Sequence, residues 1–447
     1  MNREIFREYD VRGLVGKDLD SSIVTKLGKA IGTFGSMRGV EMMTVGRDCR
    51  LSSSEYAEAI IDGLRSSGIN VIDVGVCPTP VLYFSIRRLK AGGGVMVTGS
   101  HNPPDFNGFK ICIGPDTIYG SDIKELHHIV ESGCYAAGEG DCSQYSVTSD
   151  YQEYLLNNVT VRHGLTVAVD GGNGVGGAVA VPLFERCGCT VIPLYCEMDG
   201  HFPNHFPDPT VPANLEDLIS LMRENTVDVG VAFDGDADRL GIVTDKGRIL
   251  WGDELLILFS RAILALNKNA TIIGEVKCSQ RLYDDIARHG GRPIMWKAGH
   301  SLIKGKMKEE KAFLAGEMSG HIFFADRYFG YDDAIYAALR LLEILSRENC
   351  SISDLLSDLP ETFSTPEIRI DCPDSVKFSV VKKMTDHFRE KYPIIDIDGV
   401  RIQFTKGWGL VRASNTQPVL VLRFEASDMH NLGLIRNEVE GALKAIL

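Results

Sequence analysis

Short apolar runs alternate with amphipathic stretches along the first three quarters of this 447-residue chain. The runs have the length and β-branched content of buried strands, and the stretches between them show helical spacing of apolar residues. The predicted strands include Met43–Val45, Val71–Val74, Val95–Val97, Leu165–Val169, Val229–Phe233 and Thr271–Ile273. The predicted helices include Ser54–Ser67, Leu215–Arg223, Asp253–Leu266 and Asp332–Leu345. Strands separated by helices predict mixed α/β domains.

The length of the chain predicts three or four domains. Two strand ends, Val167–Gly171 and Val231–Gly235, resemble each other and hint at repeated α/β units. Polar, glycine-rich residues at 133–149 predict a linker, and a second linker is expected at 357–365.

The pattern changes after the second predicted linker. Strands dominate there, with one helix between them and one at the end. The predicted strands are Glu367–Ile370, Gly399–Phe404, Gly407–Arg412 and Val419–Glu425, and the helices are Ser375–Glu390 and Met429–Ile446. This composition predicts a strand-rich α+β module at the C-terminus.

The composition excludes several classes of partner and location. The net charge of −13 argues against nucleic acid or an anionic membrane as the main partner. Any anionic substrate would therefore need basic groups gathered in a cleft. The eleven cysteines form no CxxC pair, only the CxC pair Cys187 and Cys189, which predicts a reduced, cytoplasmic protein. The charged N-terminus and the lack of a long apolar run predict neither a secretion signal nor a membrane span.

A hydroxyl group stands on a predicted turn directly after a buried strand. The apolar run Gly94–Val97 leads into Thr98-Gly99-Ser100-His101-Asn102-Pro103, where small residues place Ser100 on the turn. Pro103 and Pro104 prevent a helix from following at once. A lone serine on a turn is usually structural, so the motif needs a second signal.

That second signal is an alternating acidic loop after another predicted strand. Asp234, Asp236 and Asp238 would repel one another unless a cation lay between them. An EF-hand is excluded, because its sixth and twelfth positions would be Arg239 and Asp245 and a strand precedes the loop. We expect the loop to face the surface and to bind Mg²⁺. A hydroxyl and a carboxylate cluster together predict metal-assisted chemistry on a phosphate ester.

Four motifs together resemble the signature loops of the α-D-phosphohexomutases. They are Thr98-Gly99-Ser100-His101-Asn102-Pro103, Asp234-Gly235-Asp236-Ala237-Asp238-Arg239, Gly316-Glu317-Met318-Ser319-Gly320-His321 and Arg412-Ala413-Ser414-Asn415-Thr416. All four occur in the order of the family, and the resemblance covers essentially the whole chain. Within the family, the chain is most similar to the bacterial phosphomannomutase/phosphoglucomutase branch.

The resemblance implies three similar mixed α/β domains followed by a smaller α+β domain, around a central cleft. The expected domains are residues 1–146 with the phosphoserine loop, 147–248 with the metal loop, 249–360 with the sugar loop and 361–447 with the phosphate loop. It also implies interconversion of the 1- and 6-phosphates of mannose and glucose. Phospho-Ser100 and a hexose 1,6-bisphosphate would be intermediates, with the bisphosphate also acting as activator.

The resemblance implies roles for particular residues. Ser100, Lys110, Arg12 and Arg239 are expected to be catalytic, and Ser100, Asp234, Asp236 and Asp238 to hold Mg²⁺. A desolvated lysine near another cation has a lowered pKa, so Lys110 is a candidate general base. Arg239 either donates to the transferred group or holds its loop through a salt bridge. His101 is expected to structure the serine loop rather than to activate it.

The remaining expected site residues contact the substrate. They are Tyr9, Lys277, His300, Glu317, Ser319, His321, Arg412, Ser414, Asn415 and Thr416. Glu317 and Ser319 would bind the 3- and 4-hydroxyls of the sugar. The donors at 412–416 suit a phosphate that is held but not transferred.

Several alternatives stay open. Phosphoglucosamine mutases are similar but usually show Gln where Met318 stands, and Ser-Ala-Ser in place of Thr98-Gly99-Ser100. Gly172-Asn173-Gly174-Val175-Gly176-Gly177, with Glu197 later, fits the Rossmann fingerprint of an NAD-dependent oxidoreductase. The resemblance implies instead that this stretch packs a helix against a sheet. A non-catalytic metal-binding module is a further alternative. The protein could be a monomer or a dimer.

Overall fold

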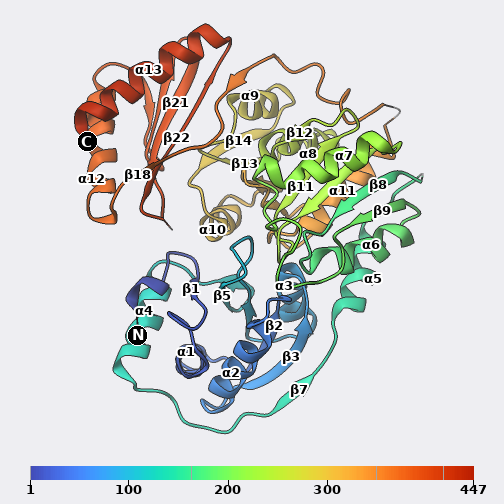
Figure 1. The fold of residues 1–447 in the computed structure, drawn as a ribbon, viewed down its shortest axis with the longest axis vertical. Helices are drawn as coiled ribbons and strands as arrows, with labels where there is room; N and C mark the ends of the chain where they lie inside the picture. Colours follow the sequence, from blue (N-terminus) through green and yellow to red (C-terminus); the bar gives the residue numbers. More distant parts are fainter. Residues whose placement is uncertain (1, 163, 349, 416) are drawn as a thin grey trace.

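The computed structural model describes residues 2–162, 164–348, 350–415 and 417–447. It contains four β-sheets, each covered by helices (Figure 1). In Figure 1 the first sheet lies at the bottom, the second at the right, the third above the centre and the fourth at the upper left. The chain thus runs in an arc that brings the fourth sheet back above the first.

The first sheet has the strand order β1-β5-β4-β2-β3-β7, with β6 paired to β5. Its strands are β1 Val11–Leu14, β2 Met42–Arg47, β3 Asn70–Val76, β4 Gly93–Val97, β5 Phe106–Ile113, β6 Asp116–Thr117 and β7 Cys142–Gln144. The accompanying helices are α1 Ser21–Ser36, α2 Ser53–Arg65, α3 Thr79–Arg88 and α4 Ser121–Ser132.

The second sheet has the order β12-β11-β10-β8-β9 and the third the order β14-β13-β15-β16. The second comprises β8 Thr166–Asp170, β9 Thr190–Leu194, β10 Val229–Phe233, β11 Leu240–Thr244 and β12 Ile249–Leu250, with α5 Thr148–Asn158, α6 Gly176–Arg186 and α7 Glu216–Glu224. The third comprises β13 Thr271–Glu275, β14 Arg292–Trp296, β15 Leu314–Gly316 and β16 Ile322–Phe324, with α8 Gly252–Leu266, α9 Gln280–Arg288, α10 His300–Glu310 and α11 Ala334–Leu345.

The fourth sheet is antiparallel and has the order β17-β22-β21-β20-β19, with β18 paired to β22. Its strands are β17 Phe363–Ser364, β18 Ile368–Asp371, β19 Ile394–Ile395, β20 Val400–Phe404, β21 Gly407–Ala413 and β22 Val419–Ala426. Two long helices, α12 Asp374–Arg389 and α13 Met429–Ile446, pack on it. The predicted fold class, three mixed α/β units and a smaller α+β unit, is confirmed.

The first three sheets share one four-stranded arrangement. In each, the first strand lies between the second and the third, and all three run parallel, while the fourth is antiparallel to the third. The matching sets are β2-β3-β4-β5, β8-β9-β10-β11 and β13-β14-β15-β16. The connection from third to fourth strand therefore leaves the carboxyl edge of each sheet, where open α/β sheets bind their ligands.

Local chemistry explains why the elements form where they do. The strands β4, β10 and β13 are buried at every residue, as expected of strands covered on both faces. Several helices begin at an aspartate whose carboxylate accepts a backbone N–H of the first turn, which satisfies an otherwise unpaired donor. Asp20 accepts from Ile23 in this way, and Asp428 accepts from Asn431.

One sequence prediction needs correction here. The predicted linker at 133–149 contributes the edge strand β7, which pairs with β3, and its last residues begin α5. All three residues of β7 are exposed, so no apolar alternation marks it. β12 pairs with β11 and so extends the second sheet. The proposed domain boundaries remain predictions.

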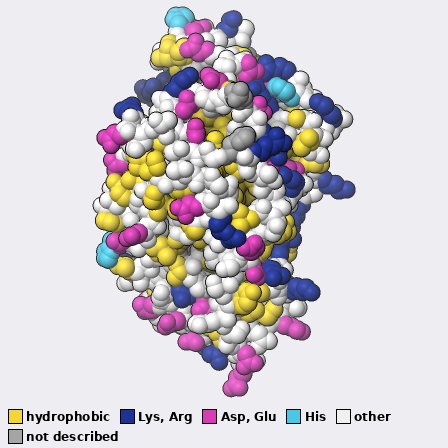
Figure 2. All heavy atoms as spheres, turned by 90° about the vertical axis from the view of Figure 1, so that its right-hand side faces the viewer, with side chains coloured by type: hydrophobic (Ala, Val, Ile, Leu, Met, Phe, Trp, Pro, Cys, Tyr) yellow, Lys and Arg dark blue, Asp and Glu magenta, His cyan; other side chains and the backbone are white. Residues whose placement is uncertain are grey.

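The surface is mixed in charge. Figure 2 shows acidic, basic and apolar side chains interspersed on one face, with basic side chains more frequent toward its right edge. Within the described part of the chain, no helix has the length and apolar character needed to cross a membrane.

Candidate active site

Three of the four predicted loops occupy the same place in three different sheets. The Ser100 turn follows β4, the acidic loop follows β10 and the loop that begins at Glu317 follows β15. Each loop joins the third strand of its sheet to the antiparallel fourth. The shared topology thus places the three loops at equivalent carboxyl edges.

Ser100 lies on a tight, buried turn. Its φ of 48° is in the left-handed region that residues other than glycine rarely adopt. Its hydroxyl donates to Asp234 Oδ2 at 2.8 Å and lies 3.1 Å from His101 Nδ1. Burial and the charges of Arg239 and Arg12 hold the pKa of His101 well below its usual value. The serine hydroxyl therefore lies between an acidic group and an uncharged imidazole.

The acidic loop is buried, which corrects the prediction that it faces the surface. Asp234, Asp236 and Asp238 each have no exposed surface. The first domain covers them: the hydroxyl of Thr79 donates to Asp236 at 2.5 Å, and the ammonium of Lys110 contacts both Asp236 and Asp238. These covering residues lie more than a hundred positions away in the chain, so the local sequence carried no sign of them.

The three carboxylates can hold a metal ion. One oxygen from each lies within 4.8 Å of the others. Among the described residues, Asp236 Oδ1 and Asp238 Oδ1 are buried without a hydrogen-bond partner, and such oxygens suit a hard divalent cation. Burial, with repulsion from Asp236 and Asp238, raises the pKa of Asp234 well above its usual range. The charged form of Asp234 is therefore disfavoured here, and a bound cation would favour it.

Lys110 is charged rather than neutral in this arrangement. Burial lowers the pKa of an ammonium, but Asp236 and Asp238 outweigh burial and raise the pKa of Lys110. The Nζ lies 2.6 Å from Asp236 Oδ2. The expected lowering of this pKa is therefore wrong for the present structure, because carboxylates rather than cations are the nearest charges.

Arg12 lies beside Lys110 in the first sheet. It is on β1, where its register partner on β5 is Gly108, two residues before Lys110. Its Nη2 donates to Asp10 at 2.6 Å. Arg12 therefore lies on the same face of the sheet as Lys110, with its guanidinium held by a carboxylate.

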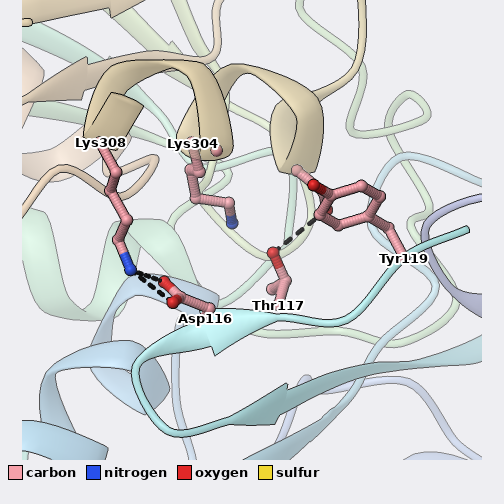
Figure 3. Close-up of a pocket in the computed structure, with 7 residues that line it drawn as sticks. Asp116, Thr117, Tyr119, Lys304 and Lys308 are labelled. Carbon is pink, nitrogen blue, oxygen red and sulfur yellow. Dashed lines mark hydrogen bonds and ion pairs between the residues drawn. The ribbon is translucent and has the colours of Figure 1, made fainter. Parts of the chain in front are cut away.

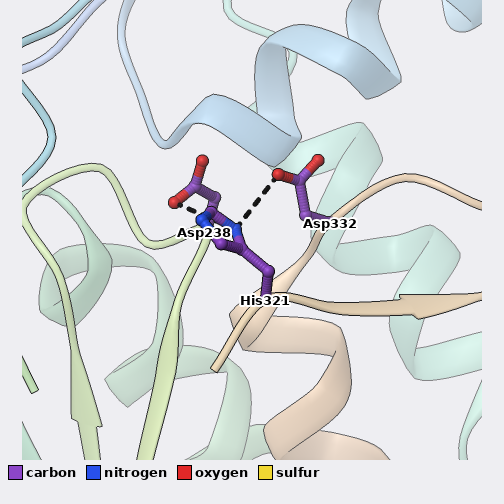
Figure 4. Close-up of side chains that lie close together, drawn as sticks. All are labelled: Asp238, His321 and Asp332. Carbon is purple, nitrogen blue, oxygen red and sulfur yellow. Dashed lines mark ion pairs between the residues drawn. The ribbon is translucent and has the colours of Figure 1, made fainter. Parts of the chain in front are cut away.

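Arg239 connects the acidic loop to the sugar loop. Its Nε donates to His321 Nε2 at 3.0 Å, so the proton of a neutral His321 is on Nδ1. That nitrogen faces Asp332 Oδ2 at 3.2 Å and Asp238 Oδ1 at 3.7 Å (Figure 4). With that proton on Nδ1, Asp238, His321 and Asp332 form a group at ion-pair distances. Their ligand atoms also lie within 4.8 Å of one another, so the same group could hold a metal ion if Nδ1 were unprotonated.

Asp332 is a buried member of the site that sequence analysis did not single out. It accepts from Lys304 Nζ at 3.0 Å and lies 3.6 Å from His300 Nδ1. Burial opposes its ionisation, but Lys304 and His321 hold the pKa of Asp332 well below its usual range. Asp332 directly precedes Asp333, the capping residue of α11. The sequence therefore indicated only the start of a helix at this position.

A small cavity adjoins this group at the contact between the first and third domains. It has a volume of about 120 Å³ and lies between β6 and α10 (Figure 3). Lys308 pairs with Asp116 beside it, and Thr117 Oγ1 lies 3.1 Å from Ser301 Oγ. The lining residues are Asp116, Thr117, Tyr119, Ser301, Lys304, Gly305 and Lys308, none of which was predicted to bind substrate.

Glu317 and its loop are buried at the third sheet. The carboxylate of Glu317 accepts from the backbone N–H of Gly299 at 2.5 Å, next to His300. Gly320 has a φ of 92°, and a Cβ there would lie 2.4 Å from the carbonyl oxygen of Leu240, so the position requires glycine. Ser319 is half-buried. The loop is thereby packed against the second sheet.

Lys277 is held at the contact between the third and fourth domains. Its Nζ lies 3.1 Å from Glu367 Oε2 and 3.5 Å from Glu275 Oε1. Burial alone would lower the pKa of Lys277, but these two carboxylates raise it. Lys277 is therefore a fixed positive charge beside the sugar loop.

The fourth domain brings its loop to the first and third domains. Arg412 donates to Asp398 Oδ2, and that same oxygen accepts from the backbone N–H of Ala298, each at 3.0 Å. Asn415 donates to the hydroxyl of Tyr9 at 2.9 Å, and Tyr9 donates to the carbonyl of Ala298 at 3.2 Å. Asp398 was missed by sequence analysis, because its partners lie 14 and 100 residues away. Ser414 is buried, and the predicted Thr416 lies outside the described residues.

The glycine motif at 172–177 serves close packing. A Cβ on Gly174 would lie 2.7 Å from the carbonyl oxygen of Gly235, and one on Gly177 would lie 2.7 Å from Cys196. The glycines therefore let the start of α6 approach the acidic loop and the second sheet. This agrees with a packing role for the motif rather than dinucleotide binding.

Comparison with known proteins agrees with this geometry. Models of the phosphoglucomutase/phosphomannomutase alpha/beta/alpha domains I, II and III match residues 3–133, 149–247 and 251–363, and the C-terminal domain of that family matches 367–442. The chain is 48% identical over 443 residues to a phosphomannomutase/phosphoglucomutase of Pseudomonas aeruginosa, covering 99% of this chain and 96% of that protein.

Two further relatives extend the comparison. A phosphoglucomutase of Neisseria gonorrhoeae is 44% identical, with 100% of this chain and 98% of that protein covered. The crystal structure of a phosphoglucomutase/phosphomannomutase family protein from Burkholderia thailandensis superposes with a TM-score of 0.95 at 41% identity, covering 100% of this chain and 98% of that one. The predicted resemblance is confirmed, and the chain belongs to the phosphoglucomutase/phosphomannomutase family of phosphohexomutases.

Proposed function

We propose that this chain interconverts hexose 1-phosphates and hexose 6-phosphates of glucose and mannose, with Ser100 as the phosphoryl carrier. The observation that carries the proposal is the hydrogen bond of 2.8 Å between Ser100 and Asp234 of the buried acidic triad. Phospho-Ser100 would transfer its phosphoryl group to the free hydroxyl of a hexose monophosphate. The resulting 1,6-bisphosphate would turn around and return its other phosphoryl group to Ser100.

The chain's own residues supply most of what phosphoryl transfer needs. Asp234, Asp236 and Asp238 would hold Mg²⁺, which when bound neutralises negative charge on the phosphoryl group. Lys110 adds a fixed positive charge against Asp236 of the triad, and Arg239 adds another next to His321. Because both cations are held by carboxylates or a ring nitrogen, they need no reorganisation when charge develops.

The proposal is tested by a coupled assay on glucose, mannose and glucosamine 1-phosphates. The assay contains Mg²⁺ and a trace of glucose 1,6-bisphosphate as activator. We expect turnover of the first two sugars with similar specificity constants and poor turnover of the third. Efficient turnover of glucosamine 1-phosphate alone would favour the phosphoglucosamine alternative, and no turnover would contradict a mutase. A cytoplasmic location stays a prediction from the cysteine content.

Removing Glu317 should weaken catalysis equally for glucose and mannose phosphates. These sugars differ only at C2, whereas Glu317 and Ser319 are proposed to bind the hydroxyls at C3 and C4. Glu317→Ala loses a charged acceptor, which should cost roughly 2–4 kcal/mol of transition-state stabilisation. The value of kcat/KM should therefore fall by the corresponding factor for both sugars. Steady-state kinetics with both substrates measure this loss.

Two further variants separate recognition from folding in that experiment. Glu317→Gln keeps an acceptor for the N–H of Gly299 and should retain the loop. Glu309→Ala, an exposed glutamate on α10, should leave both specificity constants unchanged. A large loss for one sugar only would contradict shared recognition.

Removing Arg412 should weaken the grip on the phosphate that is not transferred. Its guanidinium is 7% exposed and oriented by Asp398, at the loop that contacts both other domains. A lost charge-assisted bond predicts a rise in KM of roughly 10–100-fold for 1- and 6-phosphates alike in Arg412→Ala. More bisphosphate should escape, so activity should depend more strongly on added activator.

The matched control is Arg389→Ala, an exposed arginine of the same domain paired with Asp396. It should leave KM unchanged. A wild-type KM for both substrates in Arg412→Ala would show that this loop does not hold the phosphate.

A further inference from the structure

Arg50 is a buried cation that binds the serine loop from behind. It follows β2, and its side chain has no exposed surface. Its guanidinium donates to the carbonyl oxygens of Ser100 at 2.8 Å, Asn102 at 2.5 Å, Pro103 at 2.5 Å and Phe106 at 3.0 Å. One side chain therefore satisfies the inward-pointing carbonyls of the whole turn, from the serine to the start of β5.

Asp48 holds the backbone on the other side of the serine, and Arg50 and Asp48 together form an anchor for the serine loop. Its Oδ2 accepts from Arg50 Nε at 3.2 Å and from the backbone N–H of Gly99 at 3.1 Å. Its Oδ1 accepts from the hydroxyl of Ser53. The backbone is thus held by Asp48 just before Ser100 and by Arg50 at and after it.

This anchor explains the small residues of the motif. A Cβ on Gly99 would lie 2.4 Å from Arg50 Nε, so a larger residue before the serine would displace the guanidinium from its present position. Ser100 itself holds a φ of 48°, a conformation that persists only where surrounding contacts impose it. The bonds to its carbonyl and to its neighbours are such contacts.

The anchor also reaches the second domain, which carries the acidic loop. A Cβ on Gly235 would lie 2.4 Å from the Ser100 carbonyl oxygen, so the acidic loop packs directly on the carbonyl that Arg50 binds. The ring of Phe202 lies 5.0 Å from the guanidinium carbon of Arg50. Arg50 therefore binds the backbone of Ser100 directly, and the acidic loop packs on the same carbonyl.

We propose that Arg50, held by Asp48, is a positioning residue for phosphoryl transfer: it keeps the Ser100 hydroxyl aimed at the acidic triad. The inference rests on the proposed role of Ser100 as carrier. Arginine is required because its planar guanidinium offers five N–H donors in a fixed fork, whereas lysine offers three from a single nitrogen. A reacting group misplaced by about 1 Å loses roughly 100-fold in rate.

Arg50→Lys keeps the positive charge but removes the planar set of N–H donors. It should therefore lower kcat and leave KM nearly unchanged. We expect kcat to fall by roughly 10–100-fold. KM for glucose 1-phosphate should stay within about twofold, because the loops proposed to bind sugar and phosphate belong to other domains. The rate at which glucose 1,6-bisphosphate phosphorylates Ser100, followed by intact-protein mass spectrometry, should fall with kcat.

Arg340→Lys is the matched control. Arg340 is also buried and ion-paired, to Asp326 at 2.8 Å, but it lies on α11 away from the serine loop. It should lower the melting temperature without changing kcat. If Arg50→Lys does not fold, Ser53→Ala decides. It removes the bond from Ser53 to Asp48 and the bond that Ser53 accepts from Asn107, whose amide keeps its bond to Ser52. It should lower kcat to a smaller extent at constant KM.

The outcomes distinguish this inference from the proposed function. Wild-type protein without mutase turnover would overturn the proposed function. Wild-type turnover with unchanged kcat and unchanged Ser100 phosphorylation in Arg50→Lys, or in Ser53→Ala where that variant decides, would overturn the positioning role alone. A parallel rise in KM would also overturn it, since that result would place Arg50 in substrate binding.

Discussion

Replacing Ser100 by alanine should abolish turnover of both hexose phosphates. The hydroxyl bonded to Asp234 is the proposed phosphoryl acceptor, and the variant removes it without adding bulk. Loss of a covalent nucleophile predicts a fall in kcat of at least about 1,000-fold. Intact-protein mass spectrometry should show a phosphorylated fraction in the wild type that is missing from Ser100→Ala.

A buried serine of the same domain provides the control for that result. Ser85 on α3 is fully buried and donates to the carbonyl of Leu82, away from the acidic loop. Ser85→Ala should keep both the phosphorylated fraction and the turnover. Full mutase activity in Ser100→Ala would refute the carrier role.

Removing the divalent metal should have the second large effect. Exhaustive chelation with EDTA should abolish turnover, and Mg²⁺ should restore it, because Asp236 Oδ1 and Asp238 Oδ1 are buried without a hydrogen-bond partner among the described residues and suit a divalent cation. Asp236→Asn should bind Mg²⁺ more weakly in calorimetric titration and lose most turnover. Its free energy of unfolding should fall by up to about 3–5 kcal/mol, because it weakens a buried ion pair to Lys110.

The loss of stability in Asp236→Asn follows from burial of the triad and reverses the expectation for a surface loop. Asp116→Asn is the control, since Asp116 is an exposed carboxylate paired with Lys308. It should change neither Mg²⁺ binding nor turnover. Activity that survives complete chelation would show that the metal is not essential.

Much of the fold could be predicted from the sequence because buried strands carry their own signal. β4 and β10 carry no polar side chain and β13 has the apolar pair Ile272 and Ile273, since helices cover both faces of their sheets. β7 escaped prediction for the opposite reason: it is a short edge strand whose side chains are all exposed. Its place depends on backbone bonds to β3, which no local pattern encodes.

The sequence by itself determined which chemical groups lie together on each loop, because each loop keeps its groups within a few positions. It thereby placed Ser100, Asp234, Glu317 and Arg412 on four loops in order. That the first three loops occupy equivalent positions in their sheets could be seen only from the sheet topology. This topology depends on strand pairing across long stretches of chain.

The tertiary structure alone decided how the charges balance. Lys110 meets Asp236 and Asp238 across 126 and 128 residues, and this contact buries the triad and raises the pKa of the lysine. Arg50 meets the Ser100 carbonyl across 50 residues. Electrostatic energy depends on distance and burial, and neither can be obtained from the order of residues when the partners belong to different strands or domains.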